Sequence, residues 1–173
     1  MKMYSFLQHI CIVLLPLLIS NVIHMLVIKK DIFQWLTYPI SKKLFGINKT
    51  WRGFVFVPVM NAFVLQFINF IFSFNLDAAF YLGFALGFGY MLFELPNSFM
   101  KRRLGIQAGA QATSNKIGFA LLDKMDSAFG VNLVYFSLGF IAWKYAVLLF
   151  VCSSFTHIII SQLLVQLHIK KSF

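Results

Sequence analysis

Two of the few acidic residues in this chain have a spacing that suits a metal site. Asp123 and Asp126 lie three positions apart, so on a helix their carboxylates share one face. Carboxylate oxygens are hard ligands of the kind that Mg²⁺ prefers, and two on one face can hold one or two divalent cations. A structural alternative stays open, in which both carboxylates only cap or solvate the start of a helix.

Glu94 is a third candidate metal ligand. It lies toward the end of an apolar stretch, where an ionised group is costly unless it faces a polar site or a partner.

The next polar run, residues 96–103 (PNSFMKRR), predicts a break in the helix followed by hydroxyl and cationic donors. Lysine and arginine side chains neutralise phosphate oxygens, so the run suits a phosphorylated substrate. Its alternative is a charge signal that only orients a membrane protein.

A second polar run, residues 48–53 (NKTWRG), precedes another apolar stretch and offers a hydroxyl and two cations. If both runs lie at the same membrane face, they could clamp one polyanion. The candidate catalytic residues are Asp123, Asp126, Lys101 and Arg102, and the candidate substrate-binding residues are Lys49, Thr50, Arg52, Ser98, Arg103 and Lys116.

Other chemistries find no support in the sequence. His9, His24 and His157 fall in apolar stretches, where packing or hydrogen bonding explains them better than metal ligation. Cys11 and Cys152 have no CxxC spacing, and the chain has no GxSxG motif. The aromatic residues, 18% of the chain, indicate lipid contacts rather than base-stacking platforms, so no nucleic-acid partner is expected.

The elements that must position these residues are membrane spans. The chain has 173 residues and is 60% hydrophobic, above the roughly 45–50% that is usual in soluble domains. A helix of about 20 apolar residues crosses the hydrocarbon layer. We therefore predict an all-α polytopic membrane protein, with a single domain over residues 1–173 and about five transmembrane helices. The predicted spans are Phe6–Ile28, Phe54–Ser73, Ala78–Leu95, Ala128–Trp143 and Tyr145–Leu167.

The basic residues predict the orientation. Of the 15 Lys and Arg residues, all but Lys2 and Lys144 fall between the first and second spans, between the third and fourth, or after the fifth. Because basic loops stay in the cytoplasm, we predict an outside N-terminus, a cytoplasmic C-terminus and an active face formed by the loops near 29–53 and 96–127. The expected location is the cell inner (plasma) membrane, in contact with membrane lipids.

Two further features concern packing. The loop over residues 31–46 mixes aromatic, apolar and basic residues, which suits a helix lying in the membrane interface. Gly83 and Gly87 lie four apart and favour close helix contacts, either within one chain or in a homodimer.

Three strings together resemble the CDP-archaeol synthase family, which is similar to bacterial phosphatidate cytidylyltransferases. They are NKTWRGF at 48–54, SFMKRRLGI at 98–106 and LDKMD at 122–126, and the resemblance covers about residues 48–130. It implies a five-span enzyme that uses CTP and Mg²⁺ to convert a lipid phosphate into a CDP-lipid with release of pyrophosphate. The chain departs from the family pattern at Phe93-Glu94, usually Gly-Asp, and at Lys124-Met125, usually Gln-Leu.

On this resemblance the lipid phosphate would attack the α-phosphorus of CTP, while Asp123, Asp126 and Glu94 hold Mg²⁺. Two other functions stay open. A CDP-alcohol phosphotransferase also works on CDP-lipids, but its longer run of Asp residues with DG and AR is missing here. A small non-catalytic membrane protein would bind anionic lipid or a partner through the basic loops.

Overall fold

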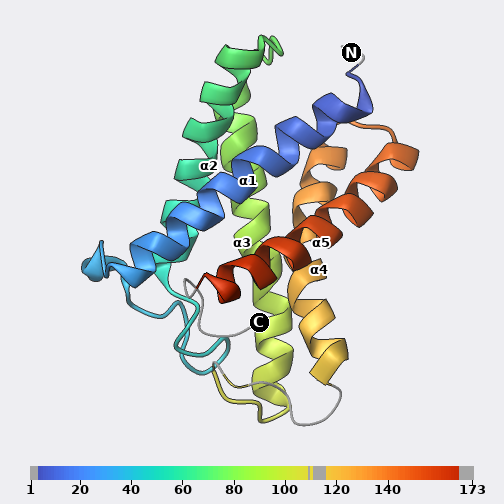
Figure 1. The fold of residues 1–173 in the computed structure, drawn as a ribbon. Helices are drawn as coiled ribbons and strands as arrows, with labels where there is room; N and C mark the ends of the chain where they lie inside the picture. Colours follow the sequence, from blue (N-terminus) through green and yellow to red (C-terminus); the bar gives the residue numbers. More distant parts are fainter. Residues whose placement is uncertain (1–3, 109, 111–115, 168–173) are drawn as a thin grey trace.

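The chain folds as a bundle of long helices (Figure 1). The computed structural model describes residues 4–108, 110 and 116–167, and these form no β-sheet. The all-α fold predicted from the sequence is confirmed. The elements are α1 (Phe6–Lys29), the 3₁₀ turn η1 (Gln34–Leu36), α2 (Trp51–Phe72), α3 (Ala79–Arg103), α4 (Lys116–Ser137) and α5 (Trp143–Gln166).

Four of the described helices, α1, α2, α3 and α5, are long and apolar enough to cross a membrane. They confirm the membrane character of the chain. The remaining long helix, α4, differs from the predicted span Ala128–Trp143 because it begins at Lys116 and ends at Ser137. Its first half therefore includes both Asp123 and Asp126. The bounds differ because hydropathy identifies only the residues that suit lipid, whereas the hydrogen bonds of a helix can continue into polar sequence.

Helix α3 also extends further than predicted. The sequence indicated a break at Pro96, but the helix runs through this residue to Arg103. That prediction was wrong because a proline removes only one backbone hydrogen bond, and a long, well-packed helix tolerates that loss. The run 96–103 therefore projects from the last turns of α3 rather than from a loop.

The loop between α1 and α2 is not an interfacial helix, so this prediction was also wrong. Asp31 and Phe33 adopt left-handed backbone conformations with φ of 50° and 57°, which end any helix, and only the short turn η1 follows. Further along, Ile40 N–H donates to Lys49 O (2.9 Å). This contact fixes the position of Lys49 just before α2.

Helices α2 and α3 approach closely at two glycines. A Cβ on Gly83 would lie 2.8 Å from Ala62 Cα, and one on Gly87 would lie 2.7 Å from Pro58 Cα. In addition, Asn61 Nδ2 donates to Gly83 O at 2.6 Å. Small residues allow such backbone approach. The close contact that the glycine spacing predicted is therefore made within one chain.

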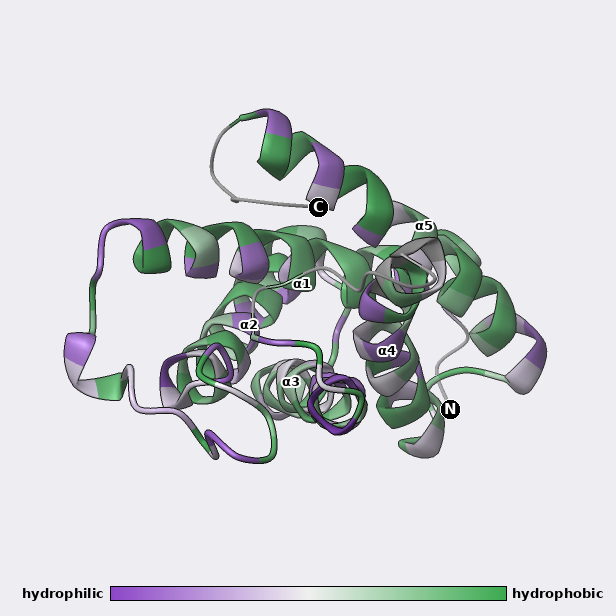
Figure 2. Cartoon of the chain, turned by 90° about the horizontal axis from the view of Figure 1, so that it is seen from below, coloured by the Kyte–Doolittle hydropathy of each residue, from purple (hydrophilic) through white to green (hydrophobic). Residues whose placement is uncertain are grey.

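The apolar core lies between the helices and includes the fully buried Leu65, Leu86, Tyr135 and Leu149. Seen along the bundle, the helices are mostly hydrophobic, while the end of α3 and stretches of the first loop are hydrophilic (Figure 2). The end of α3 lies beside the beginning of α4 and close to the loop that precedes α2 (Figure 1). This end of the bundle gathers the candidate residues.

Candidate active site

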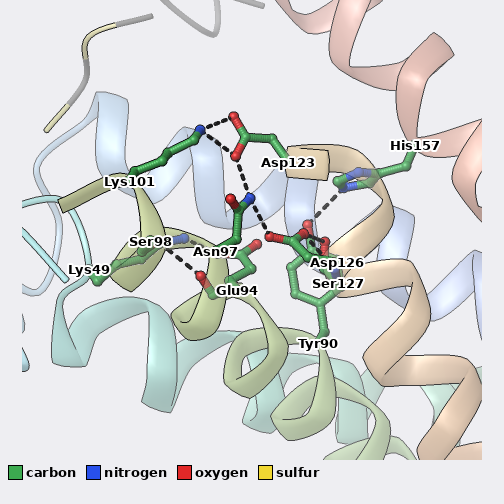
Figure 3. A network of polar contacts seen from close by, with 10 residues as sticks. All are labelled: Lys49, Tyr90, Glu94, Asn97, Ser98, Lys101, Asp123, Asp126, Ser127 and His157. Carbon is green, nitrogen blue, oxygen red and sulfur yellow. Dashed lines mark hydrogen bonds and ion pairs between the residues drawn. The ribbon is translucent and has the colours of Figure 1, made fainter. Parts of the chain in front are cut away.

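Two lysine–carboxylate pairs connect the three elements of the site (Figure 3). Lys49, just before α2, pairs with Glu94 of α3, and Lys101 of α3 pairs with Asp123 of α4. The side chains of Lys49 and Glu94 are 22% and 19% exposed, so this pair is largely withdrawn from water. Asp123 is more open, at 40%. The two pairs bring the separate polar runs of the sequence to one place.

The environment of Lys49 keeps it charged. Burial alone would lower the pKa of Lys49, but attraction to Glu94 and a hydrogen bond with that carboxylate outweigh the burial. The pKa therefore lies above its ordinary value of 10.5. The more distant carboxylates of Asp126 and Asp123 act in the same direction. At neutral pH the site thus contains an ammonium group that is held between α2 and α3.

Asn97 of α3 bridges the two aspartates of α4. Its Nδ2 donates to Asp123 Oδ1 at 2.6 Å and to Asp126 Oδ2 at 2.9 Å. Asp126 Oδ1 also accepts from the backbone N–H of Ser127 at 2.6 Å. The carboxylates of Asp123 and Asp126 therefore face the same point, as their spacing on a helix predicted.

The donor set fits a divalent cation in part. Asp123 and Asp126 provide converging carboxylate oxygens, which are suitable ligands for Mg²⁺. Among the described residues, however, no three His, Cys, Asp or Glu side chains form a metal cluster. Glu94 lies nearby but is engaged by Lys49 (Figure 3). Its role as a third metal ligand stays a prediction.

Two other candidates, Ser98 and Arg52, make hydrogen bonds away from the two aspartates, and a third, Thr50, makes no capping bond. Ser98 Oγ donates to Glu94 O at 2.9 Å, within α3. Arg52 is buried, and its Nη1 donates to Asp31 Oδ1 at 3.2 Å and to Ile32 O at 3.1 Å. Thr50 precedes α2, and its side chain makes no capping bond to this described helix. The structure thus anchors Arg52 to the first loop instead of pointing it at the two aspartates.

The remaining cations lie at the end of α3 and the start of α4. Arg102 packs beside Gly46 of the first loop, and its buried Nε has no hydrogen-bond partner among the described residues. Arg103 stacks over the Phe99 ring at 5.1 Å. Lys116 is the first residue of α4, but its side chain lies outside what the structure describes. Arg102 therefore lies where the end of α3 approaches the first loop.

The sequence matches one known protein family over nearly its whole length. A family model described as CarS-like, CDP-archaeol synthase, matches residues 3–173. The chain belongs to this family. The resemblance predicted from the three sequence strings is confirmed.

Curated CDP-archaeol synthases are similar to parts of the chain. The protein of Thermococcus kodakarensis is 35% identical over 85 residues, covering 47% of this chain and 50% of that protein. That of Pyrococcus furiosus is 32% identical over 101 residues, covering 57% and 60%. That of Thermococcus gammatolerans is 32% identical over 98 residues, covering 54% and 57%. The chain thus spans between half and three fifths of the length of these relatives. No solved structure shows a significant match.

In this member of the CDP-archaeol synthase family, Tyr90 and Asn97 join the predicted residues Glu94 and Lys101 at the site. Tyr90, Glu94, Asn97 and Lys101 follow a spacing of four, three and four, which places them on one face of α3. That periodicity was the available signal for Asn97, whose neutral amide does not stand out by charge. Tyr90 OH also contacts Nε2 of His157 on α5 at 2.8 Å, which adds a fourth element to the segment before α2, α3 and α4 (Figure 3).

Proposed function

We propose that the chain is a CTP-dependent cytidylyltransferase that converts a membrane lipid phosphate into a CDP-lipid. A phosphate oxygen of the lipid attacks the α-phosphorus of CTP, the bond from that phosphorus to the β-phosphate oxygen breaks, and pyrophosphate leaves. Membership in the CDP-archaeol synthase family supports this reaction. The observation that carries the proposal is the convergence of Asp123 and Asp126 beside Lys101.

The charges of the site suit a complex of nucleotide and cation. Three carboxylates, those of Glu94, Asp123 and Asp126, face two ammonium groups, those of Lys49 and Lys101, which leaves one net negative charge. With Mg²⁺ held by Asp123 and Asp126, and by Glu94 as predicted, the sum becomes positive and favours a polyphosphate. When bound, Mg²⁺ would neutralise the triphosphate and the departing pyrophosphate.

The cations divide between the two polar runs. Lys101, Arg102 and Arg103 at the end of α3 would bind phosphate oxygens of CTP, with Ser98 as a further donor. Lys101 is already bound to Asp123, so its contact with a phosphate requires an exchange of partners. Buried Arg102 Nε is a donor that a phosphate can satisfy. Lys49, Thr50 and Arg52 would hold the second phosphoryl group or the pyrophosphate, and Lys116 would add a further contact.

The membrane location follows from the same charges. The basic runs at this end of the bundle favour a cytoplasmic active face in the cell inner (plasma) membrane, with the N-terminus outside. A cytoplasmic face gives the site access to CTP, and the bilayer gives access to the lipid phosphate. A homodimer would have to use a face other than Gly83 and Gly87, because α2 covers both glycines.

The decisive experiment supplies the purified protein in lipid nanodiscs with labelled CTP, Mg²⁺ and a panel of lipid phosphates that differ in chain type. We expect a CDP-lipid and pyrophosphate in equal amounts with at least one lipid, and no product after chelation of Mg²⁺. Failure with every lipid would contradict the proposal and favour a non-catalytic protein that binds anionic lipid. In a separate incubation that supplies a CDP-lipid and an alcohol in place of CTP, release of CMP would instead indicate a CDP-alcohol phosphotransferase.

A further inference from the structure

Asn97 occupies the point at which the two aspartates of α4 converge. The residue is 8% exposed, and its side chain comes from α3, opposite both carboxylates (Figure 3). We propose that Asn97 is an oxygen ligand of the divalent cation, together with Asp123 and Asp126. Its amide group rotates by a half-turn when the cation binds. This inference takes one element from the proposed function, namely that a divalent cation binds at Asp123 and Asp126.

The two ends of the Asn97 amide differ in their hydrogen bonding. Its Nδ2 serves both carboxylates, whereas Oδ1 is buried and has no hydrogen-bond partner among the described residues. An unsatisfied buried acceptor destabilises the folded protein. A half-turn about the Cβ–Cγ bond exchanges the oxygen and the nitrogen with little change in shape. Oδ1 can therefore reach the position that Nδ2 now holds.

The distances from Asn97 Nδ2 to the two aspartates match the spacing of ligands around Mg²⁺. Adjacent oxygen ligands in an octahedral Mg²⁺ site with bonds of 2.0–2.1 Å lie about 2.9 Å apart. Asn97 Nδ2 lies 2.6 Å and 2.9 Å from the oxygens of Asp123 and Asp126. After the half-turn, Oδ1 would stand at similar distances from two carboxylate oxygens. Such oxygens repel one another unless a cation lies among them, so the turn and the binding of the cation are coupled.

Asn132 offers a matched control on α4. Its Oδ1 is also buried without a partner among the described residues, but its Nδ2 donates to Ala128 O at 2.7 Å and to Ser153 Oγ at 3.2 Å. Like Asn97, it has a buried amide whose nitrogen is hydrogen-bonded and whose oxygen is not, but in the described part of the chain no pair of carboxylates faces it. Replacing each asparagine by leucine removes the same chemical groups at two positions of which only one faces Asp123 and Asp126.

The test measures Mn²⁺ binding to the purified protein by electron paramagnetic resonance, without CTP or lipid substrate. We expect Asn97→Leu to weaken Mn²⁺ binding by about 10- to 100-fold, which is the range for losing a group that supports a metal site. Asn132→Leu is expected to bind like the wild type. Asn97→Asp keeps an oxygen at the same distance from the backbone, so it is expected to bind Mn²⁺ at least as tightly as the wild type. This variant also provides the test if Asn97→Leu does not fold.

Three outcomes would overturn the inference: wild-type affinity in Asn97→Leu, equal losses in Asn97→Leu and Asn97→Asp, or a wild-type protein that does not bind Mn²⁺. The binding result is independent of the reaction. A protein whose Mn²⁺ affinity depends on Asn97 but which makes no CDP-lipid would refute the proposed function alone. Synthesis of CDP-lipid together with unchanged Mn²⁺ affinity in Asn97→Leu would refute this inference alone.

Discussion

Each carboxylate of the site is matched by a nitrogen donor from another element. Glu94 pairs with Lys49, Asp123 with Lys101 and Asn97, and Asp126 with Asn97. Three carboxylates would repel one another without these donors, because their charges lie in a partly buried region. The same donors connect α3 to α4 and to the segment before α2. Single substitutions can therefore separate the roles of charge balance and catalysis.

Asp123→Asn tests the catalytic role at the residue scale. The amide keeps the size of the side chain but loses the charge that would hold Mg²⁺, so we expect turnover to fall by at least about 100-fold. Circular dichroism is expected to show unchanged helix content. Asp77→Asn, in the turn before α3 at the other end of that helix, is the control and should keep normal turnover. Near-normal turnover in Asp123→Asn would refute the assignment.

Lys49→Met tests the ion pair with Glu94. The substitution leaves a largely buried carboxylate without its lysine, so we expect the free energy of unfolding to fall by about 1–3 kcal/mol. The melting temperature in detergent reports this loss. A Lys49→Met/Glu94→Gln double variant removes both charges and should recover part of the stability. A double variant less stable than Lys49→Met would contradict the pairing.

The same pair predicts a dependence on pH. A raised pKa means that the ammonium form of Lys49 stabilises the fold below the pKa of the unfolded chain, and that this contribution is lost as the pH rises through the higher folded value. The melting-temperature difference between the wild type and Lys49→Met should therefore stay constant from pH 7 to about 10 and shrink at higher pH. A difference that already shrinks between pH 7 and 9 would contradict the raised pKa.

The sequence predicted charged site residues more readily than neutral ones. The spacing of Asp123 and Asp126 indicated a shared helical face, and the structure has them on one face of α4. Asn97 was missed because its neutral amide stands out less than the charged residues of the same run, 96–103. The contact of Arg52 with Asp31 was missed for another reason, because it depends on the irregular path of the first loop.

At the scale of elements, the glycine contact between α2 and α3 fixes the distance between the Lys49 segment and Glu94. Gly87→Leu would force its side chain against the backbone at Pro58. We expect a loss of about 1–3 kcal/mol in stability from overpacking, measured as a lower melting temperature, together with reduced turnover. Phe88→Leu, at the neighbouring exposed position, is the control and should change neither property strongly. An unaffected Gly87→Leu variant would contradict the close contact.

The helices could be predicted from the sequence to different extents. For α1 and α5, the apolar stretch and the helix nearly coincide, so the predicted bounds differ from the observed ones by at most two residues. For α3 and α4, the helix continues for many residues into polar sequence, where contacts between Asn97, Lys101 and Asp123 hold the two helices together. Hydropathy does not register such contacts, and the predicted spans were therefore too short at this end.

At the scale of the whole molecule, the orientation in the membrane can be tested with two single-cysteine variants. Asp77→Cys lies between α2 and α3, and Gln107→Cys lies beyond the end of α3, so α3 separates them. In a background in which Cys11 and Cys152 are replaced by serine, a membrane-impermeant maleimide added to intact cells should label position 77 but not position 107. The reverse pattern would place the active face outside and contradict the use of cytoplasmic CTP.

The internal ion pairs of Lys49 and Lys101 also affect discrimination among anions. An enzyme in a bilayer is surrounded by ordinary phospholipid headgroups in great excess over its substrates. A single headgroup phosphate would attract each lysine little more strongly than the carboxylate that already binds it. Such lipids would therefore displace the carboxylates of Glu94 and Asp123 poorly. A triphosphate that arrives with its own metal gives new partners to lysines and carboxylates together. In the proposed reaction, the protein's own acidic residues would compete with the phosphates of abundant lipids for Lys49 and Lys101.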